Sequence, residues 1–169
     1  MNRVYRVFET PLGWVGIVGN DGRISRLVLP RRAKCEAIEA LGEGIEGELV
    51  ETKHDFSGEA HRLAAYFAGE RVAFECGIDV SNASLFDHRV WNAAREIGYG
   101  EVETYGWIAA RMGRPGAARA VGQALGRNPI PVIVPCHRVI RSDGTLGGFG
   151  CGVDWKRRLL ALEGIGARD

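Results

Sequence analysis

The chain has 169 residues, of which 46% are hydrophobic and 25% charged, and its formal net charge is +1. A chain of this size can bury a core without disulfides or metals, as one domain or as two small lobes. We find no basic-then-apolar leader and no apolar run near the roughly 20 residues that cross a bilayer. These features predict a cytoplasmic protein with no membrane partner.

Cysteines and histidines are scattered along the chain. There are four of each, and none has the close spacing of a zinc site or a disulfide framework: Cys35, Cys76, Cys136, Cys151, His54, His61, His88 and His137. We therefore expect reduced thiols and no bound metal.

The charge is unevenly distributed. Residues 104–158 contain nine Arg or Lys and two acids, a net +7, so the remainder carries −6. A basic segment beside an acidic one suggests a polyanionic partner for one face, although ordinary fluctuation of surface charge explains it equally well.

The first 80 residues predict a small α+β lobe. Alternating and β-branched residues, with a tight turn at 20–22, indicate a hairpin or meander of three strands, at 4–10, 14–19 and 23–30. Helical periodicity follows at 31–41 and 58–68, and a further strand is expected at 72–80.

Residues 81–169 predict a mostly helical second domain. Ser84 can cap a helix over 85–97, and Thr104 can cap another over 105–112. A Gly/Pro turn then leads to a short helix over 116–127, and the last helix is expected at 153–164. Two short helices joined by such a turn form a helix-turn-helix pattern.

The helix over 116–127 has distinct faces. Ala118, Val121 and Leu125 fall on a core face, whereas Arg119, Gln123 and Arg127 share a polar, basic face. Small residues between them allow close approach to a surface: Ala117, Ala120 and Ala124. The combination suits docking on a nucleic-acid groove, but helix pairs are more often simply packed.

The stretch PVIVPCHRVI, residues 131–140, interrupts an apolar, strand-like run with three polar residues. Such residues are costly in a core unless they are paired. Either Cys136 is an inert buried thiol beside a satisfied histidine, or it is a nucleophile with His137 as its base. The acids that could orient His137 are Asp143, Asp154 and Glu163.

A glycine-rich segment, RSDGTLGGFGCG, follows the Cys-His pair. Its glycines permit close approach of the backbone to a ligand, and Phe149 offers an aromatic wall. A pocket for a flat group is one interpretation, and a plain surface turn is the other.

Taken together, the motifs VETYGWIAARMGRPGAARAVGQALGRNPIPVIVPCHRVIRSDGTLGGFG and KRRLLALEG resemble the O6-alkylguanine-DNA alkyltransferase family, the methylated-DNA–protein-cysteine methyltransferases. The resemblance runs without gaps from about 85 to 164 and is weaker in the N-terminal segment. It implies an α+β fold in which a ribonuclease-H-like lobe with an antiparallel sheet, 1–80, precedes a DNA-binding, alkyl-accepting domain, 81–169.

The resemblance also implies roles for single residues. Cys136 resembles the acceptor thiol, His137 the base that deprotonates it through a water, and Glu163 the residue that orients the imidazole. Asn128 resembles the side chain that ties the active-site turn together. Tyr105 resembles the tyrosine beside the flipped base and its 3′ phosphate, and backbone carbonyls of Cys136 and Val139 would accept from the guanine amine.

For DNA, the resemblance implies that the helix carrying Ala117, Ala120, Gln123 and Arg127 docks in the minor groove, and that Arg119 fills the gap left by the extruded nucleotide. The partner is double-stranded DNA containing O6-alkylguanine, and O4-alkylthymine is a second expected substrate. The implied reaction consumes one protein molecule per lesion and uses no cofactor. We expect a cytoplasmic monomer, nucleoid-associated in a prokaryote.

The pocket loop departs from the family pattern at Phe149 and Cys151, and at Gly150 it lacks the side chain that some members have. Phe149 stands where tyrosine is frequent, Gly150 where serine or glycine is common, and Cys151 where glycine is usual. Cys151 is expected either to narrow the pocket against bulky adducts or to form a disulfide with Cys136. A lesion-recognition protein without transfer activity is the alternative function, although Cys136 argues against it, and a transcription regulator is a more remote one.

Overall fold

The computed structural model describes residues 3–166. The chain divides into two compact units, Met1–Val80 and Ser81–Asp169. No helix among the described residues is long and apolar enough to cross a membrane.

A four-stranded sheet forms the core of the first unit. Its strands, in the spatial order β3-β2-β1-β4, are β1 (Arg3–Thr10), β2 (Gly13–Asn20), β3 (Arg23–Arg31) and β4 (Leu49–Glu51). The first three are antiparallel, as the turn at 20–22 predicts, and β4 runs parallel to β1. Strand β2 is buried at every position from Val15 to Gly19, because both faces of the sheet are covered.

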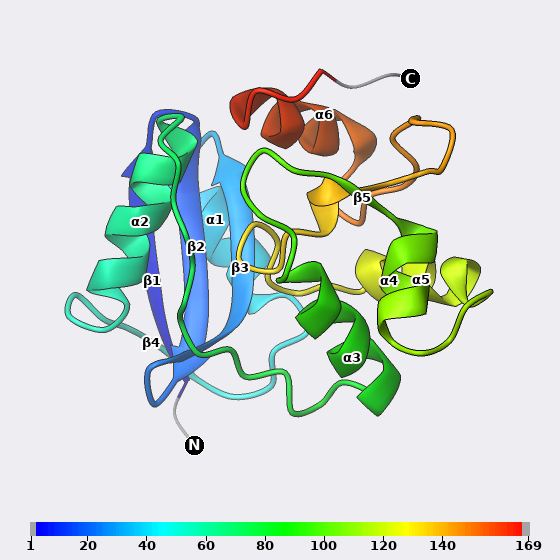
Figure 1. Cartoon of the computed structure of the whole chain (residues 1–169). Helices are drawn as coiled ribbons and strands as arrows, with labels where there is room; N and C mark the ends of the chain where they lie inside the picture. Colours follow the sequence, from blue (N-terminus) through cyan, green and yellow to red (C-terminus); the bar gives the residue numbers. More distant parts are fainter. Residues whose placement is uncertain (1–2, 167–169) are drawn as a thin grey trace. The chain divides into compact units, whose positions relative to one another are not determined.

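Helices α1 (Lys34–Gly42) and α2 (Ser57–Phe67) provide this cover, one behind the sheet and one in front of it in Figure 1. Leu41 of α1 packs on Val18 and Val28. Gly16 lies directly beneath the Leu41 side chain, where a Cβ would approach it to 2.6 Å, so glycine at 16 permits the close packing.

Three expectations for this unit need correction. The strand predicted at 72–80 is wrong: Ile78 alone bridges to Ile24, so the extended segment has no ladder of partners. The helix expected from residue 31 begins at Lys34, because Arg31 still pairs with Trp14 in the sheet. The three-residue strand β4 is too short to give a periodic pattern and was not predicted.

Within residues 81–166, the second unit contains four α-helices, a one-turn 3-10 helix and a two-stranded parallel sheet. The helices are α3 (Leu85–Ala94), α4 (Tyr105–Arg111), α5 (Ala118–Gly126) and α6 (Val153–Leu162), and the strands are β5 (Glu103–Thr104) and β6 (Val139–Ile140). Each helix lies within its predicted range and ends earlier than expected. Figure 1 shows α4 and α5 beside each other, as a helix-turn-helix requires.

Both predicted helix caps are present. The Ser84 hydroxyl accepts from the Asp87 amide at 3.1 Å, and the Thr104 hydroxyl accepts from the Trp107 amide at 3.0 Å. Each satisfies an amide that has no partner within its helix. Thr104 also belongs to β5. The same residue therefore pairs with β6, the strand that follows the Cys-His pair, and caps the start of α4.

The apolar run 131–134 is buried, as predicted, but it is not a strand. It forms a compact turn in which Pro131 bridges to Val134, and Val132 has a φ of +74°. A β-branched residue at positive φ is strained and is tolerated where surrounding packing enforces it. The prolines that frame the run favour this turn over a ladder. The α+β class itself is confirmed.

Candidate active site

Cys136 begins a one-turn 3-10 helix, η1 (Cys136–Arg138), immediately after the buried turn. Pro135, with φ −80° and ψ 60°, forms an inverse γ-turn in which the Cys136 amide donates to the Val134 carbonyl at 2.8 Å. This tight turn sets the direction of the Cys136 side chain, which is only 5% exposed.

Asn128 joins three parts of this turn. Its side-chain NH₂ donates to the Val134 carbonyl at 2.9 Å and to Cys136 Sγ at 3.0 Å, while its side-chain oxygen accepts from the Ile130 amide at 2.9 Å. Asn128 therefore fixes the loop and also directs a donor at the thiol. A donor in this position stabilises sulfur as it gains negative charge.

His137 and Glu163 form a buried pair in which neither side chain is exposed. Nε2 of His137 lies 2.6 Å from Oε1 of Glu163. The same carboxylate accepts from Arg138 Nε at 2.9 Å, from Arg138 Nη2 at 3.0 Å and from the Gly100 amide at 3.1 Å. Glu163 thus ties α6 to η1 and to the loop before β5.

This arrangement fixes the histidine tautomer. Because Glu163 only accepts, Nε2 of His137 must donate, which leaves Nδ1 as the basic nitrogen of the neutral ring. Burial lowers the pKa of His137, an effect that the Glu163 carboxylate opposes and that the cations Arg138 and Lys156 reinforce. A neutral imidazole with Nδ1 available is the form a general base requires.

The Cys136 thiol is protonated at rest. Burial raises its pKa to about 12, against smaller lowering effects from the Asn128 hydrogen bond and the Lys156 charge. Such a thiol becomes a nucleophile only if its proton is removed as it reacts, so the site needs a base nearby.

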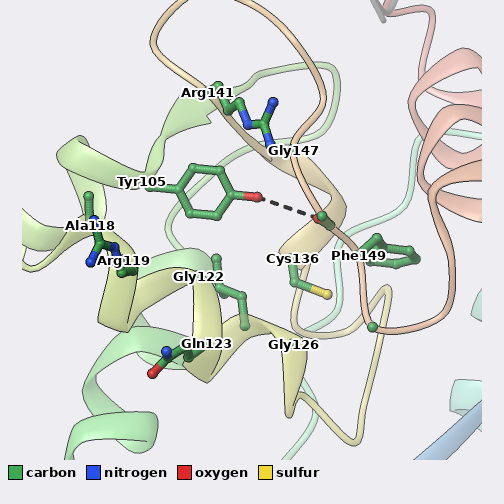
Figure 2. Close-up of a pocket in the computed structure, with 13 residues that line it drawn as sticks. Tyr105, Ala118, Arg119, Gly122, Gln123, Gly126, Cys136, Arg141, Gly147 and Phe149 are labelled. Carbon is green, nitrogen blue, oxygen red and sulfur yellow. Dashed lines mark hydrogen bonds between the residues drawn. The ribbon is translucent and has the colours of Figure 1, made fainter.

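A cavity of about 680 Å³ opens over Cys136. Figure 2 shows its two walls: α5 on one side, and on the other the glycine-rich loop, with the Tyr105 ring between them. The loop contributes Phe149 and Gly150, and α5 contributes Arg119 and Gln123. The predicted pocket loop, aromatic wall and recognition helix therefore meet at the thiol.

Other predicted site residues lie outside this lining. The residues not found in the lining include Ala117, Ala120, Val139 and Cys151. Cys151 is exposed, and its charge would act to raise the pKa of Cys136. Arg127 is bound to Asp87 of α3, with its Nη2 2.6 Å from Oδ1 of the carboxylate.

Two details of α5 differ from the expected faces. Ala118 lines the cavity and is only partly buried, rather than lying in the core. Ala124, expected among the small surface residues, is fully buried, and its carbonyl accepts from the Trp91 indole at 2.9 Å. Compared with the faces expected from the sequence, α5 is rotated about its axis, so that residues 118, 119, 122 and 123 face the cavity.

Lys156 is a site residue that sequence reasoning missed. It is fully buried, and its Nζ donates to the Val139 carbonyl at 2.6 Å, to the Gly148 carbonyl at 3.1 Å and to the Tyr105 hydroxyl at 3.4 Å. Burial lowers its pKa to about 8. The side chain connects α6, β6, the pocket loop and Tyr105. In the sequence, the signal for Lys156 was its spacing: it lies three and four positions before Leu159 and Leu160, which are buried on the same face of α6.

A helix-turn-helix whose second helix lines a cavity ending at a buried cysteine defines a protein that joins DNA binding to thiol chemistry. Comparison with known proteins agrees. Residues 85–165 match the family model described as 6-O-methylguanine DNA methyltransferase, DNA binding domain.

Similarity to named relatives extends over nearly the whole chain. The chain is 42% identical over 159 residues to a methylated-DNA–protein-cysteine methyltransferase of Mycolicibacterium paratuberculosis, covering 94% of this chain and 91% of the relative. It is 43% identical over 161 residues to the protein of that name in Methanosarcina acetivorans, covering 95% and 97%. The crystal structure of Mycobacterium tuberculosis OGT in complex with DNA aligns with a TM-score of 0.80 at 41% identity, covering 95% of this chain and 92% of that one.

The chain belongs to the methylated-DNA–protein-cysteine methyltransferase family. It is a DNA-binding transferase of alkyl-DNA repair.

Proposed function

We propose that the protein removes the alkyl group from O6 of guanine in double-stranded DNA and transfers it irreversibly to Cys136, with O4-alkylthymine as a second substrate. One observation carries the proposal: the Cys136 thiol lines the same cavity as Arg119 and Gln123 of the recognition helix. A lesion delivered by DNA on α5 therefore has a nucleophile at the end of its path.

Access to the thiol requires the nucleotide to leave the stack. A target atom inside a duplex is out of reach of a thiol that is 5% exposed, so the nucleotide must rotate into the cavity at a cost of a few kcal/mol. Arg119, exposed on α5 at the cavity mouth, is placed to occupy the vacated position. Gln123, Ala117 and Ala120 lie on the same short segment and would face the groove.

The contacts of Cys136 and His137 support the following chemistry. Nδ1 of His137 takes the thiol proton through a water while Glu163 holds the ring, and the Asn128 NH₂ stabilises the emerging thiolate. Sγ then bonds to the alkyl carbon as the bond from that carbon to O6 breaks, and the bonding electrons leave with guanine. Tyr105, which lines the cavity, would donate a proton to the departing guanine. The thioether has no group to reverse it, so each molecule reacts once.

Intact-mass spectrometry tests the proposal. After incubation with a duplex containing one O6-methylguanine, the protein should gain the mass of one methylene group, mapped to Cys136, at one equivalent per molecule. Cys136→Ala should bind the duplex and gain nothing. Binding without any gain by the unaltered protein would instead show a lesion-recognition protein, and the roles of His137 and Glu163 would fall. A sedimentation measurement on the free protein tests the expected monomer.

A further inference from the structure

Arg141 is a cation at the cavity that the proposed mechanism leaves unused. It follows β6 directly, its side chain is exposed, and it lines the cavity with Tyr105, Gly147 and Gly148. Figure 2 shows its guanidinium beside Tyr105, on the far side of that ring from α5.

The backbone at Arg141 is fixed while its side chain is left available. The Arg141 amide donates to the Thr145 carbonyl at 2.9 Å, and its carbonyl accepts from the Gly144 amide at 3.0 Å. The neighbouring carboxylate of Asp143 is engaged by the Thr145 amide and hydroxyl. Within residues 3–166, the Arg141 guanidinium has no hydrogen-bonded or ion-paired partner.

The lining of the cavity is positive. It contains Arg119 and Arg141 and no aspartate or glutamate. The positive charge of Arg141 acts to lower the pKa of both Tyr105 and Lys156, so its guanidinium lies within electrostatic range of these two groups. Lys156 is already occupied by three oxygens, so the two arginines are the cations still open to an anionic ligand.

We propose that Arg141 binds a backbone phosphate of the extruded nucleotide, opposite Arg119. This inference rests on the proposed function. A base that reaches Cys136 leaves its flanking phosphates at the mouth, where the exposed guanidinium lies, and a planar guanidinium suits a phosphate in two-point contact. Arg119 enters the stack from α5, so the opposite wall must hold the displaced backbone. The alternative anion, a carboxylate carried on the alkyl adduct itself, would have to sit deep at Cys136, away from an exposed side chain.

Binding is the first test, and it does not depend on transfer. Affinity for a duplex with one O6-methylguanine is measured from 50 to 300 mM KCl for Cys136→Ala and for the same protein with Arg141→Ala added. Loss of one phosphate contact should weaken binding about tenfold and make the slope of log affinity against log salt shallower by about 0.9. Arg89→Ala, which removes an exposed arginine of α3 outside the cavity lining, is the matched control and should change neither value by as much.

Transfer is the second test. Arg141→Ala should slow methylation of Cys136 from the duplex about tenfold and leave its rate with O6-methylguanine as the free base within twofold of the unaltered protein, because the free base has no phosphate. An unchanged salt slope, or an equal loss with the free base, overturns the phosphate contact. So does a loss confined to a duplex carrying O6-carboxymethylguanine. If the unaltered protein takes no methyl group from DNA, the proposed function fails, and the binding slopes still decide whether Arg141 holds a phosphate.

Discussion

At the scale of single residues, the site depends on one carboxylate. Glu163 accepts from His137, Arg138 and Gly100, and so it sets the tautomer of His137, the proposed base, and neutralises a buried guanidinium at once. Removal of a residue that orients a reacting side chain typically lowers activity strongly.

Replacing Glu163 by glutamine should therefore slow methyl transfer about 10–100-fold, since the amide no longer holds the Nε2–H tautomer by charge. It should also destabilise the fold by about 3 kcal/mol, because Arg138 is left buried without its counterion. Single-turnover rates well below the unfolding temperature separate the two effects. Glu96→Gln, which alters an exposed ion pair with Arg111, is the control. A folded Glu163→Gln that reacts at the normal rate would contradict the role of Glu163.

At the scale of elements, the cavity depends on how closely the pocket loop approaches α5. A Cβ at Gly150 would lie 2.6 Å from the Gly126 carbonyl oxygen at the end of α5. A backbone oxygen cannot yield as a flexible side chain can, so the absence of a side chain at 150 sets the distance between the two walls.

Gly150→Ser, which introduces the serine expected at this place in some members of the family, should consequently be harmful in this chain. Displacement of the loop should cost about 1–3 kcal/mol of stability and slow transfer from DNA. Urea unfolding and single-turnover kinetics measure the two effects. Gly42→Ala, at the end of α1, is the control, because a Cβ there meets nothing within 4 Å and Gly42 lies outside the cavity lining. If both variants behave alike, the close approach at Gly150 does not govern the site.

At the scale of the whole molecule, stability at alkaline pH should reflect Lys156. Its pKa is lowered from 10.5 to about 8, mainly by burial. Between these values the folded protein has released a proton that the unfolded chain still holds, so the contribution of Lys156 to stability rises with pH across this window and is lost as pH falls through 8.

The unfolding free energy of the unaltered protein, minus that of Lys156→Met, should thus increase by up to about 3 kcal/mol from pH 8 to 10.5. Urea unfolding at several pH values provides the measurement. Lys53→Met, at an exposed lysine, should show no such trend. A flat difference for Lys156→Met would mean that this lysine is not held in a poorly solvated position.

The sequence by itself determined the α+β class, the three-strand meander, the capped starts of α3 and α4, the helix-turn-helix of α4 and α5, and the family. These features rest on local patterns: alternation, a tight turn, cap residues at fixed spacing and contiguous motifs around Cys136. The roles carried over from the family, and the functional meaning of the boundary near 80, stay predictions.

Only the tertiary structure decided which side chains meet. It joined Glu163 to His137 across 26 positions of sequence, turned Ala118 to the cavity and Ala124 to the core, and brought Lys156 of α6 to the carbonyls of β6 and the loop. It also made residues 72–77 irregular and 131–134 a turn, because neither segment has a ladder of strand partners. Local sequence sets propensity and periodicity, whereas partners distant in sequence are brought together only when the elements pack.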